Sequence, residues 1–246
     1  MTKPPSYPEK PGLRTRCFVI LCRPENPENV GSVARAMKNT GFGHLRIVGQ
    51  ERMGAAFRTA VHAGDILDGA SFYLDLRAAE ADLNVIFAAT SKPRKNFSIL
   101  SLEEAVERMF SFPPLTGIGL VFGNERTGLT SAELRSSNYR FMIPQAGRQP
   151  SYNLAAAALL TLFHIFRHGT ERLSEGVDSQ DLPLPQAQQE ECIHFIINKL
   201  EGNGFIHATN RAHMTERIFD LLGRLALTAR DRKLLLAIFS HVGDGS

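Results

Sequence analysis

The sequence Cys17-Phe-Val-Ile-Leu-Cys22 opens the stretch, running on to Val48, that decides the fold. This apolar run has the length of a strand, and Val30 to Thr40 then has the apolar spacing of a helix that Gly41 ends. Strand character returns from His44 to Val48. A strand, a helix and a second strand in close succession are typical of a βαβ unit. The sequence therefore predicts an α/β fold with a mostly parallel sheet.

Later segments continue this pattern. Further strands are predicted at 84–89, 118–122 and 140–143, and a helix at 102–110. The segment from Asn153 to Arg167 is helix-prone and apolar on nearly every side. A helix of that kind is buried on several faces, so we expect it to pack against both the sheet and a partner subunit.

Length and composition divide the chain into parts. With 246 residues, 43% of them hydrophobic, the chain can bury a full core and has room for one ordinary domain and a small second one. We expect a flexible arm at 1–14, an α/β domain at 15–168, a polar linker at 169–189 and a helical domain at 190–246. In the last part, amphipathic helices are predicted at 190–200, 214–225 and 230–242. Thr228 and Asp231 have the spacing of a capping box before the third of them.

The composition argues against several classes of protein. No segment resembles a signal peptide and no apolar run reaches membrane-spanning length, which predicts a cytoplasmic protein with no membrane association. The three cysteines lack CxxC spacing, so neither a disulfide nor a zinc site is expected. His164 and His168 are spaced one helical turn apart, but Ile165 stands where a zinc protease has its glutamate. We therefore predict no metal.

Charge is unevenly distributed along the chain. Residues 1–168 carry 20 Lys and Arg against 14 Asp and Glu, whereas residues 190–246 carry seven of each kind. A basic surplus in the α/β part is compatible with a polyanionic partner such as a nucleic acid, although many soluble domains carry as much charge. Charge alone leaves both interpretations open.

A glycine-bracketed loop follows the strand predicted at 118–122. The stretch reads Gly117-Ile-Gly-Leu-Val-Phe-Gly-Asn-Glu-Arg-Thr-Gly-Leu-Thr130. Gly123 and Gly128 have the spacing of a phosphate-binding P-loop, but Leu129 stands where that motif needs its lysine. Glu125 would also repel phosphate. The loop is therefore suited to a neutral or cationic ligand that donates hydrogen bonds to carbonyls and a carboxylate.

Three more segments carry polar side chains where strands end or helices begin. Asn29-Val-Gly-Ser-Val-Ala-Arg35 opens the first helix, Thr90-Ser-Lys-Pro-Arg-Lys95 follows a strand, and Ile143 to Leu154 leads into the apolar helix. Ligands gather at the carboxyl ends of strands in open α/β sheets, so the loop that starts at Thr90 and the Gly123 loop are expected to face one crevice. Plain alternatives remain: Asn29 as a helix cap with a solvated Arg35, and a basic surface turn at 92–95. No GxGxxG or GxSxG pattern appears to indicate a dinucleotide enzyme or a hydrolase.

These loops, in this order, resemble the three motifs of the SPOUT class of RNA methyltransferases, in the SpoU/TrmH-type branch that methylates ribose 2′-hydroxyls. Asn29 to Arg35 is similar to the first motif, Phe122 to Thr130 to the second, and Ile143 to Leu154 to the third. The helical tail also resembles that of the TrmJ-like tRNA methyltransferase subfamily, which acts on nucleotide 32 of the anticodon loop.

The resemblance implies a fold and a reaction. The fold is the SPOUT fold, α/β with a mostly parallel sheet and a C-terminal trefoil knot, followed by a small α-helical module. The implied protein is a homodimer that binds S-adenosylmethionine in the knot, needs no metal, and completes its site across the dimer interface. The implied substrate is tRNA, methylated on the 2′-oxygen of cytidine or uridine 32.

By matched position, the resemblance also implies roles for residues. The cofactor would be held by Thr90, Ser91, Lys92, Gly123, Ile143, Ser151, Tyr152, Asn153 and Leu154. The catalytic set would be Arg35, Asn29 and Ser32, with Arg35 activating the ribose hydroxyl or holding its adjacent phosphate. Glu125 and Gly128 would order the second loop. Contacts with RNA are expected from Arg35, Lys92, Arg94, Lys95 and Arg148.

Two positions depart from the family pattern. Asn124 stands where many of these enzymes have arginine or a similar donor, and Tyr152 where they usually have leucine. Two alternatives to the implied activity are a 2′-O-methyltransferase of ribosomal RNA or of another tRNA site, and a non-catalytic RNA-binding homologue. The intact Asn29, Ser32, Arg35 and Gly123 argue against the non-catalytic alternative.

Overall fold

The computed structural model describes residues 12–49, 54–91, 98–146, 151–169 and 181–240. Its strands are β1 Cys17–Cys22, β2 His44–Val48, β3 Ser71–Tyr73, β4 Val85–Ala89, β5 Ile99–Ser101, β6 Ile118–Phe122 and β7 Tyr139–Met142. Its α-helices are α1 Pro27–Thr40, α2 Gly64–Asp68, α3 Leu76–Glu80, α4 Leu102–Ser111, α5 Ser131–Ser136, α6 Leu154–His168, α7 Gln186–Gly202, α8 Arg211–Gly223 and α9 Ala229–Ser240. Two short 3-10 helices, η1 Leu13–Thr15 and η2 Gly54–Arg58, accompany them.

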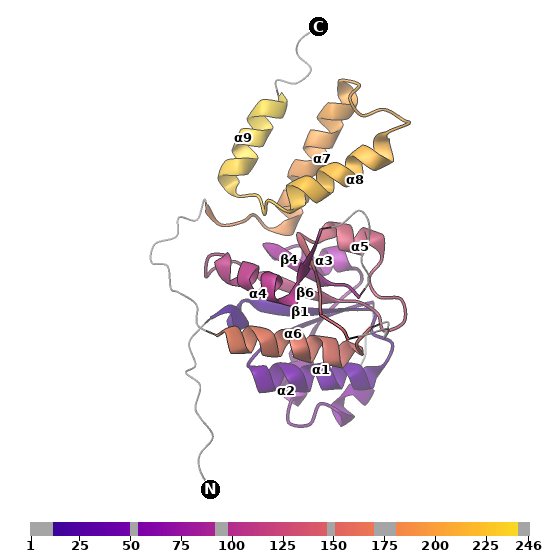
Figure 1. Cartoon of the computed structure of the whole chain (residues 1–246), viewed down its shortest axis with the longest axis vertical. Coiled ribbons are helices and arrows are strands. Elements are labelled where there is room, and N and C mark those ends of the chain that lie inside the picture. The colour runs from indigo at the N-terminus through magenta and orange to yellow at the C-terminus, as the bar shows by residue number, and fades with distance from the viewer. Residues whose placement is uncertain (1–11, 50–53, 92–97, 147–150, 170–180, 241–246) are drawn as a thin grey trace.

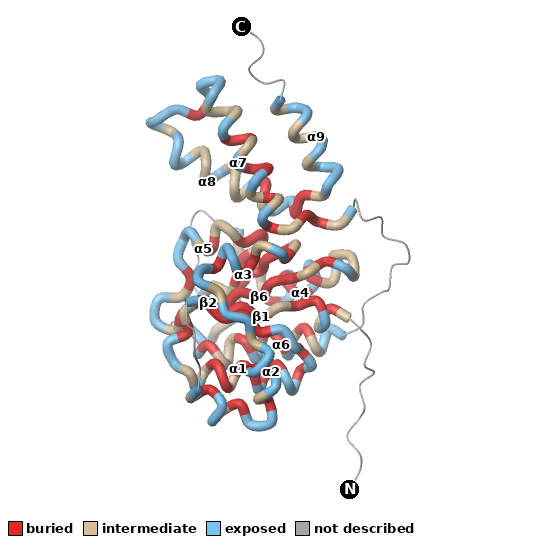
Figure 2. The backbone as a smooth tube through the Cα atoms, turned by 180° about the vertical axis from the view of Figure 1, so that it is seen from behind, coloured by how far each residue is buried: buried red, intermediate tan, exposed pale blue. Residues whose placement is uncertain are grey.

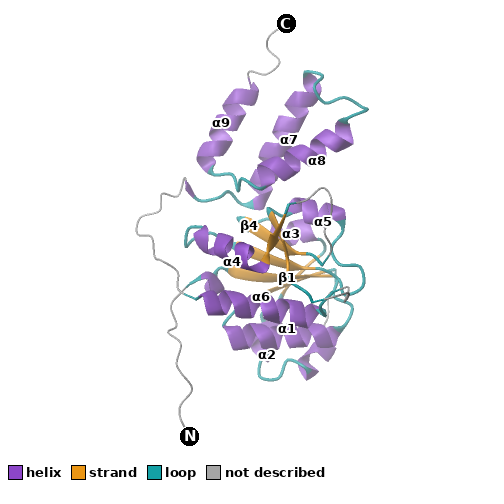
Figure 3. Ribbon diagram, in the orientation of Figure 1, coloured by secondary structure: helices purple, strands orange, loops and turns teal. Residues whose placement is uncertain are grey.

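The strands form one sheet in the order β3-β2-β1-β6-β4-β7-β5, and every strand pairing in the described residues is parallel. The prediction of an α/β fold with a mostly parallel sheet is confirmed. Figure 3 shows this sheet enclosed between helices. The expected strands and long helices of the α/β part all form, with ends that differ by a few residues at most.

Helices cover both faces of the sheet (Figure 1). The larger hydrophobic cluster lies on the face covered by α1, α4 and α6, and the smaller one on the face of α3 and α5. The four central strands are buried along almost their whole length, as the red segments in the middle of Figure 2 show. Central parallel strands covered on both sides are expected to read as continuous apolar runs, which is the pattern found at 17–22.

Several short elements were not predicted from the sequence. They are β3, β5, α2, α3, α5 and η2, each three to six residues long. An element of one turn or one strand repeat carries too few residues for a periodic apolar pattern. The two missed strands form the two edges of the sheet, where burial is weakest and the pattern is least marked.

The exposure of α6 differs from the expectation that it is buried on several faces. Its inward side, including Ala158 and Leu162, is buried against the sheet, as predicted. Leu159, Leu160 and Phe163 on its other side are exposed by 44%, 38% and 49%. The helix is therefore covered on one side only within a single chain.

The last three helices form a separate cluster, which we call the helical module and define as residues 181–240. Its own core joins α7, α8 and α9 around Ile193, Ile196 and Ile197. α7 begins at Gln186, four residues before the predicted start, because Pro185 precedes the helix and Gln186 and Gln189 are already buried. The predicted capping box forms, since Thr228 Oγ1 accepts a hydrogen bond from the Asp231 amide and the Asp231 carboxylate accepts one from the Thr228 amide.

The helical module docks beside the amino ends of β4 and β7. Asn84 and Asn138 directly precede these strands. Asn84 Nδ2 donates to the Pro183 carbonyl oxygen (2.6 Å), and the Asn84 carbonyl oxygen accepts from the side-chain amides of Gln186 (3.1 Å) and Gln189 (2.8 Å). These polar groups of Asn84 therefore meet uncharged partners on the helical module.

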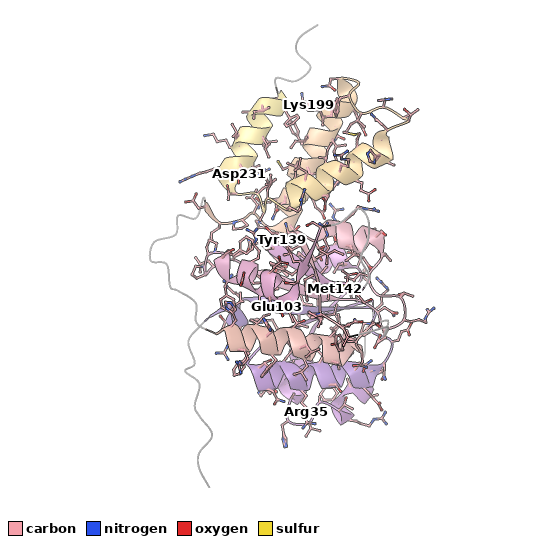
Figure 4. The ribbon with its side chains drawn as sticks, viewed as in Figure 1. Arg35, Glu103, Tyr139, Met142, Lys199 and Asp231 are labelled. Atoms are coloured by element: carbon pink, nitrogen blue, oxygen red, sulfur yellow. The ribbon has the colours of Figure 1, made fainter. Side chains whose placement is uncertain are left out.

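Asn138 and Arg140 complete the junction. Asn138, 1% exposed, accepts hydrogen bonds from the Ile86 amide (2.8 Å) and the Gln186 side chain, and donates to the Gly223 carbonyl oxygen (2.7 Å). Arg140 on β7 is buried and pairs with Asp220 on α8 (2.8 Å). Figure 4 places Tyr139 at this junction, with Met142 farther from the helical module.

Among the described helices, none combines the length and apolarity needed to cross a bilayer.

Candidate active site

Three loops meet at the carboxyl edge of the sheet, opposite the junction with the helical module. β6, β4 and β7 are parallel neighbours, so the loops that follow them leave from the same edge. Between these loops lies a pocket of about 370 Å³, a volume typical of small-molecule sites. The loop after β4 and the Gly123 loop share this crevice, as expected, and the Ile143 loop joins them, whereas the segment from Asn29 to Arg35 does not line it. Of the residues matched by position, the pocket brings together Thr90, Ser91, Gly123, Ile143, Ser151, Tyr152 and Leu154.

The loop from Gly123 to Gly128 is tight and internally braced. A Cβ on Gly123 would lie 2.5 Å from the Leu129 amide nitrogen, so only glycine fits. Asn124 Oδ1 accepts hydrogen bonds from the amides two and three residues later, both at 2.9 Å. Gly128, at φ 66°, donates its amide to the Asn124 carbonyl oxygen (2.8 Å). Asn124, the departure from the family pattern, therefore uses its side chain to fold the loop.

Glu125 joins this loop to the segment before α1. One carboxylate oxygen accepts a hydrogen bond from the Glu25 amide (2.8 Å), and the other accepts from the Asn26 amide (3.2 Å) and Asn29 Nδ2 (2.8 Å). Burial acts to raise the pKa of Glu125, but the hydrogen bonds from Asn29 and these amides outweigh it and lower the pKa below its ordinary value. The carboxylate is therefore charged at neutral pH.

Asn153 extends this contact to the third loop. Its side-chain amide donates to Asn29 Oδ1 (2.9 Å), and its Oδ1 accepts from the amides of Ala155 (2.8 Å) and Ala156 (3.2 Å). Asn153 is thus the N-cap of α6. The chain of contacts from Glu125 through Asn29 to Asn153 connects all three motifs. Asn29 and Asn153 themselves do not line the described pocket.

The first helix begins earlier than predicted. Asn26 is its N-cap, accepting a hydrogen bond from the Glu28 amide (2.8 Å), and Pro27 occupies the first helical position. Asn29 therefore lies inside the first turn, where its side chain bridges two loops and does not cap the helix. Gly31 is needed for packing, because a Cβ there would overlap the Ala56 carbonyl oxygen on η2.

Arg35 and Ser32 lie away from the pocket of their own chain. Arg35 is exposed, and Figure 4 shows it on the outer side of α1, pointing away from the sheet. Neither residue is among the described residues that line the pocket. A single chain therefore does not bring the expected catalytic arginine to the expected cofactor site.

Tyr152 lies at the rim of the pocket. Its ring is 40% exposed and its hydroxyl donates to the Pro144 carbonyl oxygen (3.0 Å). This contact ties the end of the third loop to its beginning. A leucine at this position, usual in the family, would not make it.

Four of the expected contact residues, Lys92, Arg94, Lys95 and Arg148, lie outside the described residues. Eight residues that line the pocket were not among the predicted site residues: Ala89, Phe122, Asn124, Arg126, Thr127, Leu129, Gln145 and Ala157. All of them except Ala89 and Ala157 stand within the second and third motifs, and Ala157 follows Leu154 at helical spacing, so motif membership and periodicity were available signals.

The described lining of the pocket offers little to a phosphate chain and favours a ligand that is partly apolar and partly polar. Among its described lining residues, Arg126 is the one cation and Glu125 the one carboxylate. Arg126 is 77% exposed and pairs with Glu25 at 3.4 Å, so it is not directed into an enclosed anion site. Phe122, Leu129 and Ile143 supply apolar surface beside hydroxyl and backbone groups. Such a lining suits a ligand with an apolar body and several hydrogen-bonding groups.

Comparison with known proteins gives consistent matches. The family model described as the SpoU rRNA Methylase family matches residues 16–163. The tRNA (cytidine-2'-O-)-methyltransferase TrmJ of Methanocaldococcus jannaschii is 34% identical over 154 residues, which cover 60% of this chain and 66% of that protein. The tRNA (cytidine/uridine/adenosine-2'-O-)-methyltransferase TrmJ of Pseudomonas aeruginosa is 28% identical over 246 residues, 92% of this chain and 93% of its own. The crystal structure of TrmJ from Z. mobilis ZM4 is similar with a TM-score of 0.76 at 26% identity, over 91% of this chain and 97% of that one.

Proposed function

The chain belongs to the SpoU rRNA methylase family, in its TrmJ-like branch, and from this premise we propose that it is an S-adenosylmethionine-dependent tRNA 2′-O-methyltransferase acting on cytidine or uridine 32. The observation that carries the choice of tRNA is the extent of the match. The relatives named as TrmJ from P. aeruginosa and Z. mobilis cover more than nine tenths of the chain, helical module included.

The pocket fits S-adenosylmethionine by its chemistry. The methionine part of that cofactor is positively charged at sulfur and the adenosine part carries ribose hydroxyls, so it needs apolar walls, acceptors and no lysine for a phosphate chain. The tight Gly123 loop, the apolar floor of Phe122 and Ile143, and the hydroxyls of Thr90 and Ser151 meet those needs. We propose that these residues, with Ser91, Tyr152 and Leu154, hold the cofactor.

We also propose the trefoil knot that the resemblance implies, formed by the chain from the Gly123 loop through α6. The strand order supports it. β7 inserts between β4 and β5, although both of these strands precede it in the sequence. This order places a later strand between two earlier ones, as in a chain that threads back through its own fold.

A homodimer would complete the active site. Leu159, Leu160 and Phe163 form an exposed apolar strip on α6, the helix that packs beside α1. Exposed apolar side chains gathered on one element are typical of interaction surfaces. Because Arg35 does not line the pocket of its own chain, we propose that it serves the pocket of the partner subunit.

The proposed reaction needs positioning and removal of a proton. When bound, S-adenosylmethionine would supply an electrophilic methyl group: its sulfur would keep the electron pair of the broken carbon–sulfur bond, the methyl carbon would bond to the 2′-oxygen, and the hydroxyl proton would pass to water. The three joined loops hold the donor in place, and such positioning is worth about 7–11 kcal/mol of the barrier. Arginine is a poor base, so the proposed role of Arg35 is to grip the phosphate beside the ribose with its planar guanidinium.

The remaining parts of the chain have supporting roles in this proposal. We assign the α/β domain at 15–168 to catalysis, and the helical domain at 190–246, joined by the segment 169–189, to tRNA. The cations Lys92, Arg94, Lys95 and Arg148 are proposed RNA contacts. A tRNA substrate is in keeping with a cytoplasmic site of action.

A methylation assay tests the proposal. Purified protein is given bulk tRNA or ribosomal RNA with methyl-labelled S-adenosylmethionine, and the labelled nucleotide is mapped by nuclease digestion and mass spectrometry. We expect label in tRNA, on the 2′-oxygen of nucleotide 32. A transcript that already carries a 2′-O-methyl group there is the matched control and should stay unlabelled. Label in ribosomal RNA, or at another tRNA position, would favour the first alternative, and no transfer to either RNA would favour a non-catalytic RNA-binding protein.

Mixed dimers test the shared site. Arg35→Ala and Gly123→Val subunits should each be inactive alone, because one lacks the arginine and the other an intact pocket. If the site spans two subunits, mixing them restores one working site in each mixed dimer, giving roughly a quarter of wild-type activity. No restoration in confirmed mixed dimers would place Arg35 and the pocket within one chain.

A further inference from the structure

The backbone at Arg23, directly after β1, has an uncommon conformation. Its φ is 49°, in the left-handed region that non-glycine residues seldom occupy unless their surroundings hold them there. The Arg23 amide donates to the Val48 carbonyl oxygen (2.9 Å), and the Arg23 carbonyl oxygen accepts a hydrogen bond from Asn124 Nδ2 (2.8 Å). The direction of that carbonyl group is therefore linked to the pocket loop.

The side chain of Arg23 is held by Glu133 on α5. Both terminal nitrogens of the guanidinium donate to the two oxygens of the carboxylate, the second at 3.0 Å. Two parallel hydrogen bonds between planar groups fix orientation as well as distance. The side chain of Glu133 is 14% exposed and that of Arg23 is 40% exposed, so solvent reaches this pair mainly from the arginine side.

Glu133 is itself fixed by the helix that carries it. Its carboxylate accepts from the Thr130 amide (2.7 Å) and its own amide donates to Thr130 Oγ1 (3.2 Å), which forms a capping box. The far end of α5 is held by Arg140, whose Nε donates to the Leu134 carbonyl oxygen (2.6 Å). Arg140 is in turn paired with Asp220 of the helical module. The carboxylate that grips Arg23 thus stands on a helix anchored at both ends.

The other end of this connection is the pocket. Asn124 is only 8% exposed. Its Nδ2 donates to the Arg23 carbonyl oxygen, and its Oδ1 accepts hydrogen bonds from two amides of the loop, so Asn124 connects the Arg23 backbone to these amides. Those amides belong to Arg126 and Thr127, which line the pocket. By the resemblance, many enzymes of the family have arginine or a similar donor at position 124, whereas in this chain the short amide of asparagine reaches the Arg23 carbonyl oxygen.

We propose that Arg23 and Glu133 are positioning residues for the methyl-donor pocket: the ion pair fixes the Arg23 backbone, which in turn sets the shape of the loop from Gly123 to Gly128 through Asn124. This inference rests on the proposed function, because it takes the pocket as the site of S-adenosylmethionine. Neither side chain is among the described residues that line the pocket, so both act through Asn124.

Glu133→Gln in the full-length protein is the main test. Glutamine keeps the capping box but loses the charge that holds Arg23. We expect the Kd for S-adenosylmethionine, measured by calorimetry, to rise about tenfold. This is the size of effect expected from the loss of a charge-assisted hydrogen bond. The KM for S-adenosylmethionine should rise with it while the KM for tRNA stays unchanged. Arg23→Lys, which keeps a cation, should lose only part of the affinity.

Two further variants separate positioning from general stability. Asp82→Asn breaks a second two-bond pair, with Arg46 (2.6 and 2.8 Å), which does not touch the pocket, and should lower thermal stability with an unchanged Kd. Arg23→Gly relieves the left-handed backbone but removes the guanidinium, and should weaken binding as Glu133→Gln does.

The outcomes are distinguishable. A Glu133→Gln or Arg23→Lys protein that melts earlier but binds S-adenosylmethionine like the wild type would overturn the inference and leave the pair merely structural. So would an Arg23→Gly protein with full affinity. If the wild-type protein binds no S-adenosylmethionine, the proposed function fails and this inference fails with it, whereas wild-type binding with unaffected variants rejects the inference alone.

Discussion

Asparagines join separate segments at both the amino and the carboxyl ends of the strands, yet the two networks differ in chemistry. At the amino ends, Asn84 and Asn138 meet neutral amides of the helical module, and Asn138 is almost completely buried. At the carboxyl ends, Asn153 donates to Asn29, which in turn donates to the charged Glu125, and Asn153 is exposed.

This difference in chemistry corresponds to a difference in role, since the amino ends dock the helical module and the carboxyl ends are proposed to bind the ligand. A buried network in which each amide is satisfied is rigid and costly to break, because an orphaned polar group cannot turn to water. A partly exposed network around a carboxylate can exchange partners with solvent, so it is easier to adjust when a ligand enters. We therefore expect changes at the amino ends to cost stability, and changes at the carboxyl ends to cost binding.

The largest expected effect is that of Asp220→Ala, at the junction with the helical module. It leaves Arg140, 1% exposed, without its carboxylate partner. Removing one member of a buried ion pair costs about 3–5 kcal/mol of unfolding free energy. Chemical denaturation measures the loss, and calorimetry measures the Kd for S-adenosylmethionine in the folded protein. Asp220→Asn, which keeps an acceptor, should lose less. If the binding free energy of S-adenosylmethionine fell as much as the free energy of unfolding, the proposed difference between the two ends of the sheet would be contradicted.

The next effect is that of Asn138→Ala, set against Asn153→Ala. The first removes the hydrogen-bond partners of the Ile86 amide, the Gln186 side chain and the Gly223 carbonyl oxygen, at a cost of about 2–3 kcal/mol. The second removes a helix N-cap, worth about 1 kcal/mol, and the link to Asn29. Denaturation and ligand titration on both variants should show Asn138→Ala with the larger loss of stability and Asn153→Ala with the larger loss of affinity. If the ratio of lost stability to lost affinity were the same in both variants, the two ends of the sheet would not differ in function as proposed.

The sequence predicted the pocket edge far better than the junction. Strand ends, the spacing of Gly123 and Gly128, and the loop before α6 are local patterns, and they located the pocket without knowledge of contacts. Asn84 bonds to a partner about a hundred residues away in the sequence, and Asn138 bonds to partners about fifty to eighty-five residues away. Glu125 and Asn29, which bond to each other, are likewise about a hundred residues apart. No local pattern distinguishes such an asparagine from one in a turn. Arg140 likewise reads as a polar residue in a strand, although it is buried.

A smaller effect is expected from acidification, and only at the carboxyl edge. The hydrogen bonds from Asn29 and the Glu25 and Asn26 amides lower the pKa of Glu125, so its contribution is fully present above the ordinary glutamate pKa of about 4.3 and is lost as the pH falls through the lowered value. We expect the affinity for S-adenosylmethionine to fall at that acidic end. The amides of the Asn138 network do not titrate and should not contribute.

Glu125→Gln tests this assignment. It should weaken the affinity at neutral pH by about fivefold, the size of one hydrogen bond. It should also flatten the acid limb of the affinity profile, measured by calorimetry between neutral and acidic pH. Asp82→Asn is the control, since the Arg46 guanidinium also lowers the pKa of Asp82 while that pair lies outside the pocket. An acid limb that survives in Glu125→Gln would assign the titration to another group.

The smallest expected effect is that of Tyr152, the second departure from the family pattern. Tyr152→Phe removes the hydrogen bond to Pro144 but keeps the ring, and because the hydroxyl is accessible to water the loss is about 0.5 kcal/mol, roughly twofold in the Kd for S-adenosylmethionine. Tyr152→Leu restores the usual residue and removes both hydrogen bond and ring. If the ring packs on the ligand, the leucine variant binds more weakly than the phenylalanine variant. If the hydroxyl alone matters, because it ties the loop, the two variants bind equally. Stability should hardly change in either, since this loop belongs to the adjustable end of the sheet.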